Sequence, residues 1–258
     1  VFTVYLTFVL GRILFNSTIA FVSSAFLATS FYHAMNSAVY THDVTTSFFL
    51  MLFCIMLYTI VKEKRMLRFC MLGIVAGFFM NTKFTNIMFV LMPFMAATVE
   101  CFFSEKRCHR RQNMLLWFYG LMCYSIITVS IFFVFNVHLF FHFEHYRNLA
   151  EMLRINWYER FQQMDIPMLQ RWFDSTVAAI GLPVSILAFP GTMVVTRMMC
   201  SQKVRLEKRI LYIILICMLA CYYLFWRSYV PPRFIIVVAP LLCILAANGA
   251  ECLLRSKK

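Results

Sequence analysis

The residue types best suited to chemistry in this chain are a few ionisable side chains that adjoin long apolar runs. Asp43 stands in the segment Tyr-Thr-His-Asp-Val-Thr-Thr, directly before one such run. Ionisable groups at membrane depth are costly and tend to be functional. The Asp43 carboxylate, with His42 beside it, could bind a substrate hydroxyl, a metal ion or a catalytic partner. The alternative is a helix cap, since Asp and Thr are favoured where helices begin.

Three cations in similar positions are candidates for binding an anionic group. Lys83 follows Asn81-Thr82, and its ammonium is a point charge suited to a phosphate. Arg227 and Arg233 bracket the segment Ser-Tyr-Val-Pro-Pro, where the prolines predict a stiff loop between two helices. Arg is a good bidentate phosphate ligand. The alternatives are a lysine that snorkels to the membrane surface and arginines that only anchor a helix end.

A group of histidines offers a possible metal site. His138, His142 and His145 are spaced i, i+4, i+7, with Glu144 beside them, so one face of a helix would carry all three. That spacing suits a metal ion. Four aromatic residues interleave with the histidines, however, and this pattern favours an aromatic face at the membrane interface. The sequence therefore assigns no metal ligands, and a divalent metal is the one cofactor left open.

Composition indicates that membrane helices position these side chains. The chain has 258 residues, of which 62% are hydrophobic, 17% aromatic and 14% charged, and its mean hydropathy is +0.75. Soluble domains are nearer half apolar and a quarter charged. The ten cysteines are scattered, mostly within apolar runs and without metal-ligand spacing, which is typical of small buried hydrophobes. Nucleotide-binding, zinc-protease and serine-hydrolase motifs are absent from the sequence.

Nine apolar runs divide the chain, and none shows the alternation of a barrel strand. They cover residues 1–11, 13–35, 44–61, 67–82, 84–103, 114–136, 174–198, 210–226 and 234–254. We therefore predict an all-α, polytopic bundle of about eight or nine membrane helices, a single membrane domain over residues 1–258. The runs at 67–82 and 84–103 could instead form a hairpin that does not cross completely. The hydrophilic stretch 138–172 is predicted to be an amphipathic segment at the outer surface.

The distribution of charge predicts the orientation. The net charge of +13 could indicate nucleic-acid binding, but the basic residues cluster in alternate gaps between apolar runs. If all nine runs cross, 17 of the 24 Lys and Arg lie on one side and seven on the other. The positive-inside rule places the larger group in the cytosol. Asp43, Lys83, Arg227 and Arg233 then share the outer or lumenal side, and the sequon at Asn16 should stay unmodified on the cytosolic side.

Several segments, taken in order, resemble landmarks of the membrane-embedded GT-C glycosyltransferases. The resemblance is to the protein O-mannosyltransferase and aminoarabinose-transferase branch, which uses sugars linked to polyprenyl phosphates. The segments are residues 11–16, Asp43 with the helix after it, residues 72–85 with the Thr82-Lys83 pair, residues 180–191 and residues 232–247. Their order and spacing over residues 11–254 carry the resemblance.

The resemblance implies transfer of a sugar, such as mannose, from a polyprenyl phosphate of the dolichyl type to a protein or glycan acceptor. Asp43 and His42 would be catalytic, while Lys83, Arg227 and Arg233 would bind the lipid phosphate. The chain would be a multi-pass protein of the endoplasmic reticulum membrane, with a bacterial inner membrane as the alternative. Few glycines and many Phe, Met and Cys residues favour the first. Its partners would be membrane lipid and, as a further option, other membrane proteins in a complex, but not nucleic acid.

The chain departs from the family pattern in one respect. Family members carry an acidic catalytic residue in the first lumenal loop, and nothing here corresponds, because the chain resembles the family from its second helix onward. We expect that loop to precede residue 1. A non-catalytic membrane subunit with the same fold would explain the departure equally well. A transporter is a further alternative, although the two halves of the sequence are not similar to each other.

Overall fold

The computed structural model describes residues 1–39, 41–83, 86–103, 107–137, 144, 147–148, 151, 168–201, 204–225 and 235–255. Within these ranges the regular elements are helices, and no strand occurs. The all-α prediction is confirmed. The helices are α1 (Phe2–Leu14), α2 (Ser17–Thr29), α3 (Phe31–Ala38), α4 (His42–Lys62), α5 (Met66–Thr82), α6 (Ile87–Val90), α7 (Met92–Phe103), α8 (Arg107–Phe135), α11 (Met168–Ile180), α12 (Leu182–Cys200), α13 (Leu206–Phe225) and α15 (Ala239–Arg255).

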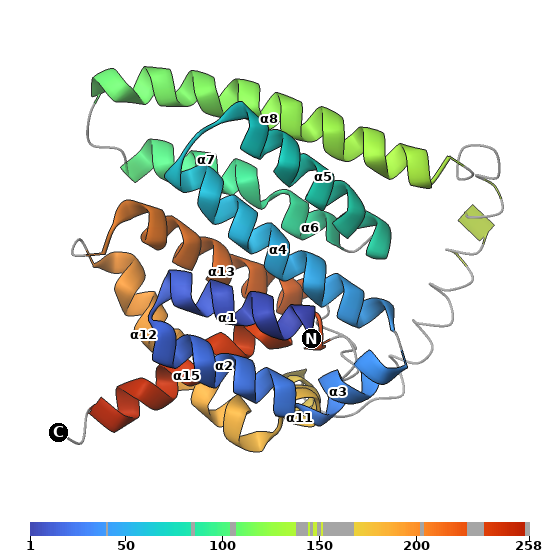
Figure 1. Cartoon of the computed structure of the whole chain (residues 1–258), viewed down its shortest axis with the longest axis vertical. Coiled ribbons are helices and arrows are strands. Elements are labelled where there is room, and N and C mark those ends of the chain that lie inside the picture. Colours follow the sequence, from blue (N-terminus) through green and yellow to red (C-terminus); the bar gives the residue numbers. More distant parts are fainter. Residues whose placement is uncertain are drawn as a thin grey trace.

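The long helices lie side by side in a bundle, with α8 along one edge (Figure 1). Helix α5 packs against both α8 and α4, and α15 packs against α12 and α2. Helix α8 exposes Phe118, Ile126 and Val134, which are 58%, 60% and 71% accessible. Lipid solvates large apolar side chains on an outer helix well, whereas water does not.

Length and composition allow three of the described helices to cross a membrane: α4, Asn113–Phe135 within α8, and α12. The pair α2 and α3, bent by 61°, is a fourth candidate if it forms one span. Shorter apolar helices are α1, α5 and Ile87–Phe103. The helical membrane character is therefore supported, while nine crossings remain a prediction.

The predicted continuous helices 13–35 and 174–198 are each broken at a residue with a local cause. The run 174–198 divides at Gly181, whose φ of 87° lies in the left-handed region that favours glycine, and Pro183 then stands in the first turn of α12. The run 13–35 divides at Ser30, which ends α2 and caps α3. The Ser30 hydroxyl also donates to the carbonyl oxygen of Ala179 at 2.7 Å. The single-helix predictions for these two runs were wrong.

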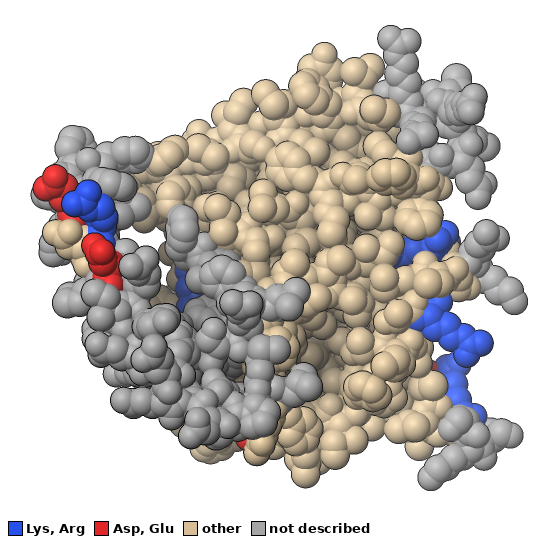
Figure 2. Space-filling model, turned by 180° about the vertical axis from the view of Figure 1, so that it is seen from behind, with Lys and Arg blue, Asp and Glu red and all other residues tan. Residues whose placement is uncertain are grey.

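Lysine and arginine side chains gather at one end of the molecule, the right-hand end in Figure 2, where α4, α12 and α15 finish. Buried Glu100 lies at this end, accepting a hydrogen bond from Trp117 Nε1 at 3.0 Å and pairing with Lys64 Nζ at 2.7 Å. Asn16 is also engaged here, because its Oδ1 caps α2 and its Nδ2 donates to Glu251. The arrangement agrees with the one-sided charge pattern of the sequence.

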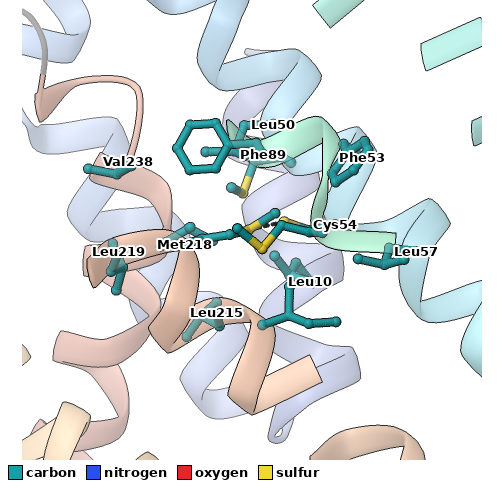
Figure 3. Close-up of a cluster of buried hydrophobic side chains, with 14 of the residues drawn as sticks. Leu10, Leu50, Phe53, Cys54, Leu57, Phe89, Leu215, Met218, Leu219 and Val238 are labelled. Carbon is teal, nitrogen blue, oxygen red and sulfur yellow. Dashed lines mark hydrogen bonds between the residues drawn. The ribbon is translucent and has the colours of Figure 1, made fainter. Parts of the chain in front are cut away.

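A cluster of buried side chains from α1, α4, α6 and α13 forms the centre of the bundle (Figure 3). Leu10, Leu50, Phe53 and Phe89 are all fully buried. Helix α4 contributes most of its length to this cluster. The helix that begins beside Asp43 is therefore held on several sides by close packing.

Helices α12 and α15 approach closely at two glycines. A Cβ at Gly191 would lie 1.8 Å from the carbonyl oxygen of Leu245, and a Cβ at Gly249 would lie 2.2 Å from that of Leu187. Backbone, rather than a movable side chain, blocks both positions. Small residues permit this type of contact between membrane helices.

Replacing Gly191 with Ala should lower the free energy of unfolding by about 3 kcal/mol, because the two helices must separate to admit the methyl group. Thermal unfolding of the purified protein in detergent measures the effect. Met193→Ala is the control, since Met193 is on the same helix and 56% exposed. An equal stability for Gly191→Ala and wild type would contradict the close crossing.

Candidate functional site

Asp43 occupies the first turn of α4 at the end of the bundle opposite the basic cluster. The N-cap residue is Thr41, which has extended backbone angles and makes no side-chain cap hydrogen bond. The Asp43 carboxylate is therefore not the cap itself, although its charge is favourable near the positive end of the helix dipole. Asp43 is only 8% exposed. A carboxylate so buried requires a partner.

That partner is Lys83, the residue that ends α5. Lys83 Nζ forms an ion pair with Asp43 Oδ1, and the two side chains are 23% and 11% exposed. One turn further along α4, the hydroxyl of Thr46 donates to that of Thr82 at 3.0 Å. The outer ends of α4 and α5 are thus joined by two adjacent polar contacts. The sequence singled out Asp43 and Lys83 separately and gave no sign of their pairing.

Asn86 and Asn136, together with Asn81 of α5, extend this polar group. We call the whole set the outer polar layer: Asp43, Thr46, Asn81, Thr82, Lys83, Asn86 and Asn136. Asn86, 2% exposed, donates to the carbonyl oxygen of Phe79 at 2.8 Å and to Thr82 Oγ1 at 3.1 Å. Asn136, just after α8, donates to Asn81 Oδ1. Sequence reasoning missed both Asn86 and Asn136, although each lies where an apolar run starts or ends. The layer fixes the ends of α4, α5 and α8 together.

The segment before α15 also reaches α4. Ser47 Oγ donates to the carbonyl oxygen of Ile236 at 2.7 Å. Tyr222 of α13 lies within electrostatic reach of Asp43, and its ring stacks on Phe89 with centroids 5.8 Å apart. Tyr222 and the backbone at Ile236, both far from α4 in the sequence, therefore lie against the first two turns of α4.

Several buried polar atoms of α3, α11 and the start of α4 lack a hydrogen-bond partner among the described residues. They are His33 Nε2, Thr41 Oγ1 and Trp172 Nε1. His33 lines a cavity of about 480 Å³ together with Tyr5, Phe8 and Ser24. Buried polar groups without partners are uncommon in native proteins. These atoms are available as hydrogen-bond donors and acceptors for a polar ligand.

The remaining predicted site residues are placed differently or lie outside the described ranges. His42 is exposed, and its side chain forms no hydrogen bond or ion pair with Asp43 or Lys83 in the described part of the chain. Arg227, Arg233 and the histidines at 138, 142 and 145 lie outside the described residues, as does most of the predicted amphipathic segment 138–172. Over the described residues, no group of three or more His, Cys, Asp and Glu side chains is close enough to hold a metal ion. A divalent metal remains a prediction.

Comparison with known protein families bears on this geometry. The model of the dolichyl-phosphate-mannose-protein mannosyltransferase family matches residues 1–136, slightly more than half of the chain. The chain belongs to this family. The matched region of this mannosyltransferase-family protein runs from α1 to the end of α8 and contains the whole outer polar layer. The GT-C resemblance is confirmed, and at the level of the family the protein is a glycosyltransferase. No curated protein sequence matches the chain.

Removing one member of the ion pair should destabilise the mannosyltransferase-family fold. We expect Asp43→Asn and Lys83→Met each to lower the unfolding free energy by about 1–3 kcal/mol, because a partly buried charge loses its counter-charge. The double variant should be more stable than the sum of the two losses predicts. Thermal unfolding of all four proteins in the same detergent measures this coupling. Strictly additive losses would mean that the two charges do not interact.

Proposed function

We propose that this protein transfers a sugar, as its family implies, from a polyprenyl phosphate of the dolichyl type to a protein or glycan acceptor. The reaction takes place at the end of the bundle that carries the outer polar layer. The observation that supports this site is the partly buried Asp43–Lys83 ion pair within the family-matched region. The orientation from the positive-inside rule makes this end lumenal. We further propose the endoplasmic reticulum membrane as the location.

The chemistry requires two functions at one place. In the displacement, the acceptor oxygen forms a bond to the anomeric carbon, the bond from that carbon to the phosphate oxygen breaks, and the acceptor proton passes to a base. The leaving polyprenyl phosphate gains negative charge, which a fixed cation stabilises. The Lys83 ammonium, positioned by Asp43, is suited to that role, with Arg227 and Arg233 as additional phosphate ligands.

The carboxylate has a different role from the cation. Asp43 has one oxygen on Lys83. No hydrogen bond from a described side chain engages the other carboxylate oxygen, which can accept a hydrogen bond from the sugar or the acceptor, or bind a divalent metal. The adjacent His42 is exposed and can contact the acceptor from the surface. Because the Asp43–Lys83 pair is only partly shielded from solvent, a negatively charged lipid phosphate can approach Lys83 without the pair first separating completely.

Variants of the full protein test this proposal by transfer of mannose from dolichyl phosphate mannose. Asp43→Asn and Lys83→Met should each lower the transfer rate by about 100-fold or more, the range typical for loss of one positioned acid–base or electrostatic group. The control is Asp174→Asn, an exposed carboxylate on α11 outside the outer polar layer. Its rate should equal that of the wild type.

The double variant Asp43→Asn/Lys83→Met separates a functional pair from a structural one. It restores charge balance and so recovers stability, but the proposal expects it to remain inactive. Recovery of transfer in the double variant would show that the pair only holds α4 to α5. A folded wild-type protein that transfers no sugar from any polyprenyl phosphate donor would count against the enzyme and favour the non-catalytic membrane subunit.

A further inference from the structure

A separate cavity with a charged side lies at the opposite, basic end of the bundle. It has a volume of about 720 Å³ and opens where the end of α1, the start of α2, and helices α12, α13 and α15 meet. Leu14, Ile19, Val194 and Met198 contribute apolar walls. This volume is within the range of sites for small molecules and lipid head groups, roughly 300–1,000 Å³. No residue of the proposed transfer site lines it.

The polar side of this basic-end cavity carries more positive than negative charge. Its lining includes Arg205, Lys208 and Arg255 but a single carboxylate, Glu251. Both oxygens of that carboxylate are already engaged, since Arg255 pairs with Oε1 and Asn16 Nδ2 lies 3.1 Å from Oε2. Within the described parts of the chain, no ion pair includes Arg205 or Lys208. Two of the three cations therefore have no protein counter-charge there.

The two uncompensated cations are close enough to repel each other. Arg205 directly precedes α13 and Lys208 lies in its first turn, three positions later, so the two side chains face the same side of the helix. Burial lowers the pKa of Lys208, which precedes the apolar run 210–226, and the nearby charge of Arg205 lowers it further. Bound anionic groups relieve both effects, because they supply the missing negative charge.

The polar walls of the cavity are also held in place before any ligand binds. The carbonyl oxygen of Leu14, at the end of α1, accepts hydrogen bonds from Lys208 Nζ at 2.9 Å and from the Tyr212 hydroxyl at 2.7 Å. Each contact joins α13 to the end of α1. A lysine that keeps one hydrogen bond to the backbone still has two N–H donors for a phosphate oxygen.

We propose that this cavity binds the phosphate-bearing head group of an anionic phospholipid from the leaflet on the basic side of the membrane. Arg205 and Lys208 contact the phosphate, and the apolar walls receive the first carbons of the acyl chains. The positive-inside rule places this end in the cytosol, and anionic lipids are concentrated in the cytoplasmic leaflet. Basic pockets between membrane helices on that side are suited to such head groups. A free phosphate ion would leave the apolar walls unused.

Lipid-dependent thermal unfolding tests the proposal. The full protein, purified in a neutral detergent, is titrated with dioctanoyl phosphatidylglycerol, whose charge is carried by its phosphate alone. The unfolding temperature should rise and saturate, which gives an apparent affinity. Arg205→Gln should weaken that affinity about fivefold, and Arg205→Gln/Lys208→Gln about 25-fold, from the energy typical of one basic residue beside an anionic lipid.

The controls separate the lipid site from general surface charge. Arg65 lies at the same end of the bundle, is outside the cavity, and has a side chain that is 74% exposed, so Arg65→Gln should leave the affinity unchanged. Dioctanoyl phosphatidylcholine and inorganic phosphate should each give little stabilisation. Equal stabilisation by either one would overturn the proposal, as would an Arg205→Gln variant that binds like wild type or an Arg65→Gln variant that is equally weakened.

Discussion

The structure depends on one constraint, which is that lipid solvates apolar side chains but not polar ones. Polar groups must therefore pair with each other or lie at the ends of the helices. Helix α8 accordingly exposes large apolar residues along its length, whereas Glu100, Asp43 and Asn86 are buried with partners. Hydroxyl groups within the helices follow the same constraint. Thr128 and Ser24, for example, donate to carbonyl oxygens of the preceding turn in their own helices. Ionisable side chains therefore collect at the two ends of the bundle.

The two ends are chemically different, and this difference organises the function that we propose. One end carries the outer polar layer, whose two charged members, a carboxylate and an ammonium, are paired with each other. The other end carries most of the lysines and arginines that the structure describes, and Glu100 and Glu251 each pair with a cation there. Helix α4 runs from the first end to the second through the buried centre of the bundle. A single rigid helix thus positions Asp43 relative to the membrane.

The Asp43–Lys83 ion pair lies within the region that the family model matches. The matched region ends at Asn136, the residue that closes the outer polar layer by its contact with Asn81. A partly buried ion pair is weak evidence for stability, because desolvation offsets much of the attraction between the charges. Its location within the region that the mannosyltransferase-family model matches is the reason to consider it functional.

The sequence by itself determined the membrane character, most helix ranges, the one-sided charge and the family. It also identified Asp43 and Lys83 as separate candidates at the same end. Only the tertiary structure decided that these two residues, 40 positions apart, form a pair, that Thr41 and not Asp43 occupies the N-cap position of α4, and that Arg205 and Lys208 line one cavity with residues of α1 and α15. The reason is physical. Hydropathy and charge act on each segment through its own contact with lipid or water, so local windows reveal them. Contacts between side chains depend on how the helices pack against each other. That packing is set by contacts between distant segments, such as those of Gly191 with Leu245 and of Gly249 with Leu187, which a short stretch of sequence does not reveal.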